Sequence, residues 1–268
     1  TLAEMRAAFA VTIAPRIIAG VKTWVVTPAE VAPENRERVL VHLHGGAYVF
    51  NGGETAAIEA IPMAHFGRIT VISVDYRLAP EHPFPAALDD AVAVWKEVIR
   101  TWKPRSAGLF GVSAGGGLTL ATVHRLNELR LPLPGAIAVG TPWSDLTRTG
   151  DSYFTNEFID DVLVTGDGVL AAAAKLYAGT NDPKNALISP VYGDFAGFPP
   201  AILTTGTRDL FLSNTVRVHR KLRRAGVDAE LQVFEGMSHA EYVYLFNTPE
   251  SREAFTEIGR FLSAHLAK

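Results

Sequence analysis

Cysteine is absent from this chain of 268 residues, which excludes disulfide bonds, thiolate catalysis and cysteine-ligated zinc. Apolar runs of about 18 residues, the length needed to span a bilayer, are also missing, so we expect no membrane span. Positive charge is not in excess either, since 25 Lys and Arg stand against 28 Asp and Glu. The composition therefore gives no electrostatic case for a nucleic-acid or acidic-lipid partner.

One short basic run, residues 220–224, departs from this even scatter, and its spacing is typical of the solvated face of a helix. The sequence has no visible secretory leader, so a cytoplasmic location is the default expectation. It starts at Thr1 rather than Met, which leaves an N-terminal extension open. With 48% hydrophobic residues, the chain is long enough for one large α/β domain with a substantial core.

Short apolar runs alternate with helical patterns along most of the chain. This alternation predicts a parallel sheet with helices on both faces. The predicted strands are 20–27 (antiparallel or at an edge), 39–44, 69–74, 107–110, 135–140, 201–205 and 229–234. The predicted helices are 2–10, 54–66 (kinked or interrupted by Pro62), 86–101, 118–123, 169–177, 214–225 and 255–266.

The alternation breaks at 144–190, where helical patterns occur without a strand. A segment of roughly 45 residues is long for a simple connection. We therefore expect it to form a helical cap over the sheet, with the N-terminal helix packed beside it. The predicted division is 20–143 and 191–268 for the core, and 1–19 and 144–190 for the cap.

Ser113 lies at the centre of a G-x-S-x-G motif between an apolar strand and a helical pattern. Glycines at 111 and 115 leave room where the backbones of strand and helix nearly touch. The serine hydroxyl would then point outward, and the N–H of Ala114 at the helix N-terminus would point at the same spot. This setting favours a nucleophilic serine, although the bare motif also fits a glycine-rich turn with an incidental serine.

Polar residues follow three further strands, at His44-Gly45-Gly46-Ala47, Asp209 and His239. In open α/β sheets, ligands bind beyond the carboxyl ends of the strands. A serine hydroxyl needs a base to take its proton, which His239 would supply, and Asp209 would orient and stabilise the imidazolium. Backbone N–H groups of the glycine-rich loop would stabilise an oxyanion by roughly 3–4 kcal/mol per donor. The chain order Ser, Asp, His is that of the α/β-hydrolase fold.

Each of these residues also has a simpler interpretation. Asp209 could cap the helix that follows it, His239 could be an exposed loop residue, and Gly45-Gly46 could be an ordinary turn. Asp75 also ends a strand and competes for the role of the acid. His42 and His44 share a strand face, but no third ligand accompanies them, so we expect no metal.

The motifs together resemble those of the hormone-sensitive-lipase-like family of bacterial esterases, within the α/β-hydrolase superfamily. The matching segments are His44-Gly45-Gly46, Asp75 to Ala86 (DYRLAPEHPFPA), Gly111 to Gly116, Ser189-Pro190, Pro199-Pro200, Gly206 to Leu210 and Gly236 to His239. They span nearly the whole chain and are highly specific in combination.

This resemblance implies a cofactor-free carboxylesterase that acts on small-molecule esters, of short to medium acyl length, or on lactones. It assigns the catalytic roles to Ser113, Asp209 and His239. It also implies a helical cap, and a homodimer is left open. The implied oxyanion donors are amides of Gly45, Gly46, Ala47 and Ala114. Apolar residues near these motifs are candidates for the pocket wall, with core packing as the alternative: Tyr48, Phe50, Trp143, Leu210 and Tyr242.

Two positions depart from the family pattern. Ala47 replaces a usual glycine, and alanine at positive φ would be strained by about 1 kcal/mol. Val112 replaces a usual aspartate and cannot accept hydrogen bonds from neighbouring loops. Amide hydrolysis is a rival reaction of the same triad. It would need firmer protonation of the leaving group by His239 than ester hydrolysis does. A small-molecule receptor, like the plant gibberellin receptors related to this family, would be expected to have a damaged triad, whereas Ser113, Asp209 and His239 are all present. A dinucleotide enzyme would need a G-x-G-x-x-G motif after an early strand, and the sequence has none there.

Overall fold

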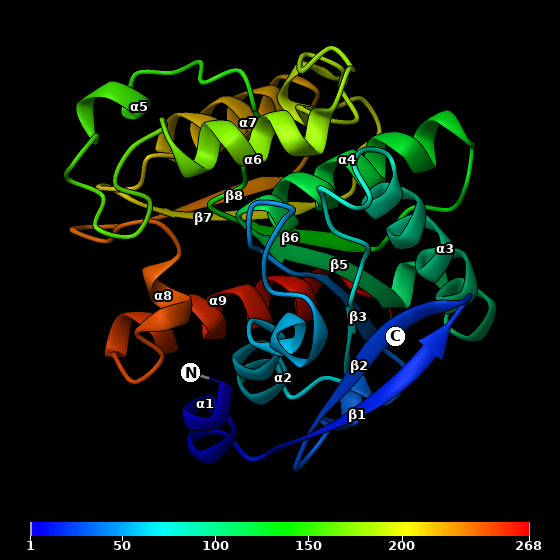
Figure 1. Ribbon diagram of the computed structural model, residues 1–268. Coiled ribbons are helices and arrows are strands. Elements are labelled where there is room, and N and C mark those ends of the chain that lie inside the picture. Colours follow the sequence, from blue (N-terminus) through cyan, green and yellow to red (C-terminus); the bar gives the residue numbers. More distant parts are fainter. Residues whose placement is uncertain (1, 268) are drawn as a thin grey trace.

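The computed structural model describes residues 2–267, and the strands in that range form one sheet of eight (Figure 1). Along the sheet the order is β1-β2-β4-β3-β5-β6-β7-β8. The strands are β1 (Val11–Ile18), β2 (Val21–Pro28), β3 (Val39–Leu43), β4 (Val71–Val74), β5 (Ala107–Val112), β6 (Ala136–Gly140), β7 (Ala201–Gly206) and β8 (Ala229–Phe234). The α-helices are α1 (Leu2–Ala8), α2 (Ala60–Gly67), α3 (Ala86–Thr101), α4 (Ala114–Glu128), α5 (Ser152–Thr155), α6 (Val169–Ala178), α7 (Leu212–Arg224), α8 (Glu241–Tyr244) and α9 (Pro249–His265). The 3₁₀ helices are η1 (Pro33–Asn35), η2 (Gly53–Ala57), η3 (Pro104–Ser106) and η4 (Pro190–Tyr192).

Strands β3 to β8 run parallel, whereas β1 and β2 are antiparallel to their neighbours. Every residue of β3, β4, β5, β6 and β7 is buried. Strands covered on both faces need mainly apolar side chains on both, which explains their largely apolar sequences. Because β3 to β8 are parallel, the carboxyl ends of β3, β5, β7 and β8 all lie at one edge of the sheet.

β1 was not among the expected strands. Pro15 lies in its middle, and proline cannot donate to a strand ladder, so a strand containing it is tolerated at a sheet edge. β1 occupies that edge, and β2 is paired on both sides. Residues 11–18 therefore belong to the sheet, and the expectation that 1–19 is part of a helical cap is wrong for these residues. Thr1 and Lys268, at the ends of two expected spans, lie outside the described residues.

Helices cover both faces of the sheet, each face with its own apolar cluster (Figure 1). The first cluster contains residues of α3, α4, α6 and α7, and the second contains residues of α1, α2, α8 and α9. Met5 of α1 belongs to the second cluster, and the ring of Phe9 packs against Phe66 and Phe246. The N-terminal helix thus lies across the sheet from α6, and the expectation that it packs beside the 144–190 segment is wrong.

The predicted helix at 54–66 is divided into η2 and α2. Pro62 falls in the first turn of α2, where the N–H that proline lacks has no partner within the helix anyway. Between β6 and β7 the chain forms α5, α6 and η4, and the described residues of this stretch include no strand.

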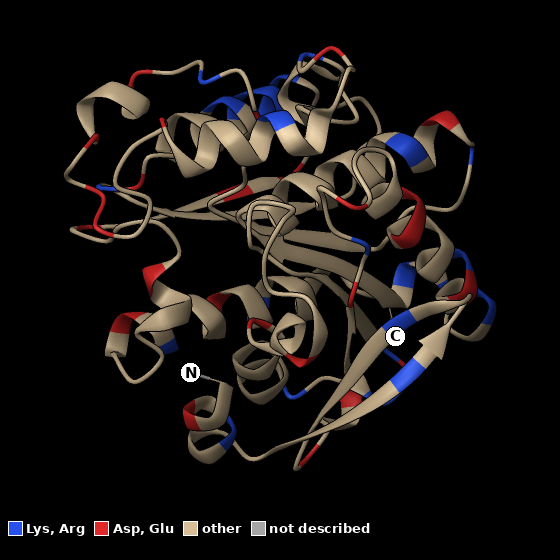
Figure 2. Ribbon diagram, viewed as in Figure 1, with Lys and Arg blue, Asp and Glu red and all other residues tan. Residues whose placement is uncertain are grey.

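Basic residues gather on α7, as Figure 2 shows. Arg220, Arg223 and Arg224 are exposed, whereas Leu222 is buried, so the run 220–224 supplies the solvated face of an amphipathic helix. Within residues 2–267, none of the helices is both long and apolar enough to cross a membrane.

Candidate active site

Ser113 occupies the turn between β5 and α4, with φ +58° and ψ −123°. This conformation is strained for a residue with a side chain, and hydrogen bonds hold it on both sides of the turn. The Ser113 N–H donates to the carbonyl of Gly140 at 2.9 Å, and its carbonyl accepts from Trp143 N–H at 2.9 Å. A Cβ at Gly115 would overlap the carbonyl oxygen of Leu43, which is the steric reason for glycine there.

Asp209 and His239 follow β7 and β8, and their side chains meet. The Nδ1 of His239 lies 3.0 Å from Oδ1 of Asp209, and both residues are buried. With its Nδ1–H donated to the carboxylate, neutral His239 has a free lone pair on Nε2. Nε2 is buried and has no hydrogen-bond partner among the described residues. This is the tautomer that a general base requires.

Asp209 is fixed by donors from its own loop and strand. Its Oδ2 accepts the hydroxyl of Thr205 at 2.7 Å, and its Oδ1 accepts the N–H of Phe211 at 2.8 Å. The ring of Phe211 packs edge-on against the His239 imidazole, with centroids 4.8 Å apart. The carboxylate therefore has one orientation, in which Oδ1 faces the imidazole.

Ser113 and His239 line one cavity of about 540 Å³. The wall is largely apolar and comes from the loop after β3, the segment before α6, the start of α6, and α8. Its other lining residues are Gly46, Ala47, Phe50, Val162, Leu163, Val164, Thr165, Asp167, Gly168, Val169, Leu170 and Tyr244. A small organic molecule in this cavity would contact both the hydroxyl-bearing residue and the imidazole-bearing residue.

The loop after β3 has an unusual backbone, because Gly46, Ala47 and Tyr48 all have positive φ, at +115°, +53° and +64°. Ala47 is thus in the left-handed region, where a side chain costs roughly 1–2 kcal/mol. The backbone N–H groups of Gly46, Ala47 and Ala114 have no hydrogen-bond partner within the described part of the chain. Free N–H groups beside a nucleophile can stabilise a developing oxyanion.

Gly45 differs from the other three expected donors. Its N–H donates to Oε1 of Glu59 at 2.8 Å, so it is not available to an oxyanion. Oε2 of Glu59 lies 2.9 Å from Nε2 of His42, whose Nδ1 contacts the hydroxyl of Ser73 at 2.8 Å. All four residues are buried or nearly so. The Gly45 amide is therefore a structural support of the loop, and this corrects the expectation that it is an oxyanion donor.

His42 and His44 do not converge on a common ligand position. His44 stacks on Tyr76, with ring centroids 4.0 Å apart, and its Nδ1–H donates to the Gly45 carbonyl at 2.7 Å. Burial lowers the pKa of His44 to about 3, so its imidazole is neutral at ordinary pH. Among the described residues, no group of three potential ligands of the His, Cys, Asp or Glu type is close enough to hold a metal ion.

Asp75, the rival acid, accepts the N–H of Gly53 at 2.9 Å and has no hydrogen bond to a histidine within residues 2–267. It is half-buried, and this burial raises the pKa of its carboxyl. The structure therefore associates Asp209, rather than Asp75, with His239.

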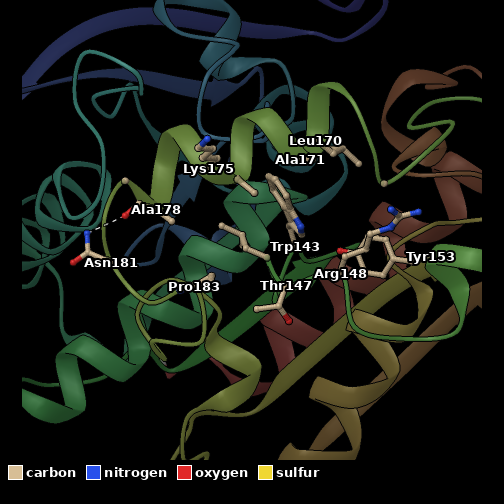
Figure 3. A pocket seen from close by; sticks show the side chains of 14 residues that line it. Trp143, Thr147, Arg148, Tyr153, Leu170, Ala171, Lys175, Ala178, Asn181 and Pro183 are labelled. Carbon is tan, nitrogen blue, oxygen red and sulfur yellow. Dashed lines mark hydrogen bonds between the residues drawn. The ribbon is translucent and has the colours of Figure 1, made fainter.

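The five expected pocket residues divide unevenly. Phe50 lines the cavity that contains Ser113, and it is 54% exposed. Trp143 instead lines a second cavity, of about 330 Å³, beneath α6 (Figure 3). Leu170, which Figure 3 also labels, lines both cavities. Tyr48, Leu210 and Tyr242 are core residues, each at most 3% exposed.

The close approach of the 156–165 stretch to the loops of Asp209 and His239 was not predicted from the sequence. Val162, Leu163 and Val164 form part of the cavity wall, and Asp160 accepts backbone N–H groups from both the Asp209 loop and the His239 loop. The only signal in the sequence was a set of apolar residues among acids in a segment without strands. Nothing in that pattern identifies which loops the segment contacts.

Comparison with known proteins shows the family to which this chain belongs. The family model for the alpha/beta hydrolase fold matches residues 40–243. An acetyl-hydrolase of Streptomyces hygroscopicus is 31% identical over 226 residues, covering 84% of this chain and 75% of that protein. An esterase of Acinetobacter venetianus is 28% identical over 255 residues, covering 95% of this chain and 82% of that protein.

Solved structures give the same answer. A crystal structure of an esterase is 47% identical, with a TM-score of 0.97, and the match covers 99% of this chain and 81% of that one. An esterase from the bacterial hormone-sensitive lipase family is 31% identical, with a TM-score of 0.89, over 96% of this chain and 86% of that one. The fold and the family resemblance predicted from the sequence are both confirmed.

Proposed function

Because this chain belongs to the α/β-hydrolase fold family and is a carboxylesterase similar to the hormone-sensitive-lipase-like bacterial esterases, we propose that Ser113, His239 and Asp209 form its catalytic triad. The observation that carries the proposal is the state of His239. Its Nδ1 contacts the carboxylate of Asp209, and its buried Nε2 has no hydrogen-bond partner among residues 2–267. His239 also lines the same cavity as Ser113. That arrangement suits transfer of the serine proton.

In the acylation step, Ser113 Oγ attacks the ester carbonyl carbon and His239 Nε2 takes the hydroxyl proton. The negative charge moves to the carbonyl oxygen, where the N–H groups of Gly46, Ala47 and Ala114 stabilise it. His239 then donates its proton to the alcohol oxygen as the carbon–oxygen bond breaks. Asp209 stabilises the imidazolium and keeps its own charge throughout.

In the deacylation step, a water molecule gives a proton to His239 and attacks the acyl-enzyme carbonyl. The second tetrahedral intermediate collapses, the acid leaves, and His239 returns the proton to Ser113 Oγ. No cofactor takes part in this sequence, because every proton is exchanged between His239, Ser113, the alcohol and water.

The apolar cavity wall supports esters of short to medium acyl length, or lactones, as substrates. Phe50, Leu163 and Leu170 offer contact area to a hydrocarbon chain, and the cavity volume of about 540 Å³ suits a small ester. We infer that 144–190 acts as the cap, since its residues supply much of this wall. The cytoplasmic location stays a prediction from the sequence, and the oligomeric state stays open.

The test is a chain-length series of aryl esters, assayed beside a lactone and an anilide of the same acyl group. We expect kcat/KM to be highest for short or medium acyl esters and negligible for the anilide, since an amine leaving group needs fuller protonation than an aryl oxide. Substantial anilide turnover with negligible ester turnover would overturn the proposal.

A further inference from the structure

Asp160 is a buried carboxylate in the middle of the inserted segment, only 1% exposed. Its oxygens accept four backbone N–H groups, those of Val162, Leu163, Leu210 and His239, at 3.0, 3.0, 2.8 and 3.4 Å. Two of these donors belong to its own loop. The other two belong to the residue after Asp209 and to His239 itself.

The neighbours of Asp160 reach the same two loops. The side-chain amide of Asn156 donates to the carbonyls of Thr207 and Asp209, at 3.1 and 2.9 Å. The N–H of Asp161 donates to the hydroxyl of Ser238 at 3.2 Å. We call residues 156–161 the bridging loop, because its hydrogen bonds connect the loop after β7 to the loop after β8.

No Lys, Arg or His within residues 2–267 forms an ion pair with Asp160. Burying a carboxylate without a cation is costly, and the cost is offset only if N–H donors satisfy its oxygens. Asp160 therefore stabilises the site only while its donors stay in place. Displacement of Leu210 N–H or His239 N–H would leave charged oxygen unsatisfied, so the carboxylate opposes separation of the two loops.

We propose that Asp160 is a positioning residue of the active site, which sets the loop of Asp209 against the loop of His239 so that the Nδ1–H···Oδ1 contact of 3.0 Å is kept. This inference rests on the triad assigned under the proposed function. Asp160 is not among the residues that line the cavity of Ser113 and His239. It acts through the backbones of Leu210 and His239.

The same carboxylate links the relay to the cavity wall. Val162 and Leu163, whose N–H groups it accepts, line the cavity beside His239. The segment that contacts substrate is thereby tied to the residues that move the proton. Because Asp160 also accepts the N–H groups of Leu210 and His239, its loss should lower the rate of the chemical steps more than it weakens substrate binding.

The decisive variant is Asp160→Asn, which keeps the shape of the side chain but has one acceptor oxygen instead of two. If the amide oxygen replaces Oδ1, the NH₂ group faces the N–H of Leu210, and two donors oppose each other. We expect kcat for an aryl ester to fall about tenfold to a hundredfold, as for a small misplacement of catalytic groups. KM should change much less than kcat.

Asp151→Asn is the matched control, because Asp151 lies in the same segment and is exposed. It should leave kcat at the wild-type value. A second variant, Asn156→Ala, removes the two hydrogen bonds to the loop of Asp209 from a half-buried position and should lower kcat in the same direction by less. If Asp160→Asn does not fold, Asn156→Ala decides the question.

A spectroscopic measurement separates this proposal from the assignment of the nucleophile. In the Ser113→Ala background, the Nδ1–H proton of His239 should give a downfield proton resonance, identified by its loss in a His239→Gln variant. Adding Asp160→Asn should broaden or abolish it, because a loosened hydrogen bond exchanges faster with water. This signal does not depend on hydrolysis, so it tests the positioning role even if Ser113 is not the nucleophile.

A folded Asp160→Asn protein with wild-type kcat and an unchanged resonance would overturn the proposal. So would equal losses in Asp160→Asn and Asp151→Asn, or a lowered melting temperature with kcat retained. Wild-type kcat in Asn156→Ala would count against it in the same way if the aspartate variant cannot be purified.

Discussion

The two halves of the site are held in different ways. The loop after β3, with Gly46 and Ala47, is supported from within its own connection, since Gly45 and its partner Glu59 are 14 residues apart. The loops of Asp209 and His239 are supported by Asp160, which is 50 residues from Leu210 and 79 from His239. One half is thus local in sequence, whereas the other is assembled by the inserted segment.

This difference predicts which catalytic function each perturbation affects. Changes near Glu59 should act through oxyanion stabilisation and leave the Asp209–His239 contact intact. Changes in the bridging loop should act through that contact and leave the strained loop after β3 unaffected. Ser113 lies between the halves, and its loss should remove the contribution of both.

Replacement of the shared nucleophile should have the largest effect. Ser113→Ala is expected to lower kcat for esters by about 10⁶-fold, the loss typical of a missing serine in a triad. The measurement is steady-state hydrolysis of an aryl ester, with circular dichroism and melting temperature to establish that the variant folds. A folded variant that keeps more than a few per cent of the activity would show that the nucleophile lies elsewhere.

On the His239 side, Asp209→Asn should lower kcat by about 10⁴-fold, because an amide no longer selects the tautomer with a free Nε2. Asp75→Asn is the matched control at another strand end, and it should chiefly change stability through the contact with Gly53. The two kcat values are compared at equal folded fraction. A larger kcat loss at Asp75 would reverse the assignment of the acid.

On the oxyanion side, Glu59→Leu leaves the buried Gly45 N–H without its acceptor. We expect the free energy of unfolding to fall by about 1–3 kcal/mol and kcat to fall about tenfold to a hundredfold. Chemical denaturation and ester kinetics measure the two effects. The Nδ1–H resonance of His239 should stay unchanged, and its loss would contradict the independence of the two halves.

Glu59→Gln is the control for that variant. Its amide oxygen can accept from Gly45, while its NH₂ donates to Nε2 of His42, provided that His42 carries its proton on Nδ1 toward Ser73. We expect stability and kcat near the wild-type values. A loss as large as that of Glu59→Leu would mean that the charge of the carboxylate, rather than its acceptor oxygen, supports the loop.

The smallest effect is expected at Ala47, whose φ is +53°. Ala47→Gly relieves left-handed strain but increases the entropy of the unfolded chain, so the unfolding free energy should rise by no more than about 1 kcal/mol. Ala93→Gly, inside α3, should instead lower it by about 1 kcal/mol. Denaturant titration of both variants checks the contrast, and destabilisation by Ala47→Gly would show that the left-handed strain at Ala47 is smaller than the entropic effect on the unfolded chain.

The residues that follow strands could be predicted from the sequence, whereas the contacts of the inserted segment could not. Ser113, Asp209 and His239 lie one, three and five residues beyond the ends of β5, β7 and β8, so the parallel topology brings them to one edge of the sheet. Asp160 lies in a segment without strand periodicity, and both of its catalytic-loop partners are at least 50 residues away. Contacts of that range leave no pattern in a single sequence.

The direction of the side chains beside the loop after β3 could not be predicted from the sequence either. Tyr48 and Phe50 are two residues apart beside the same motif, yet Phe50 lines the cavity while Tyr48 stacks on Tyr177 in the core, with ring centroids 3.7 Å apart. The positive φ values of Ala47 and Tyr48 turn the chain so that simple alternation does not apply. β1 was not predicted because Pro15 lies in the middle of its strand pattern. A proline is tolerated there because β1 is at the edge of the sheet.

The most direct test of the central claim is covalent labelling of the enzyme with a serine-directed organophosphate. Attack by the activated hydroxyl would displace the leaving group and attach one phosphoryl group per active enzyme, which intact-mass spectrometry measures and peptide mapping locates. We predict one label, on Ser113, in step with the loss of esterase activity, and no labelling of Ser113→Ala. Stoichiometric labelling of another residue, or inactivation of the enzyme without modification of Ser113, would contradict the account.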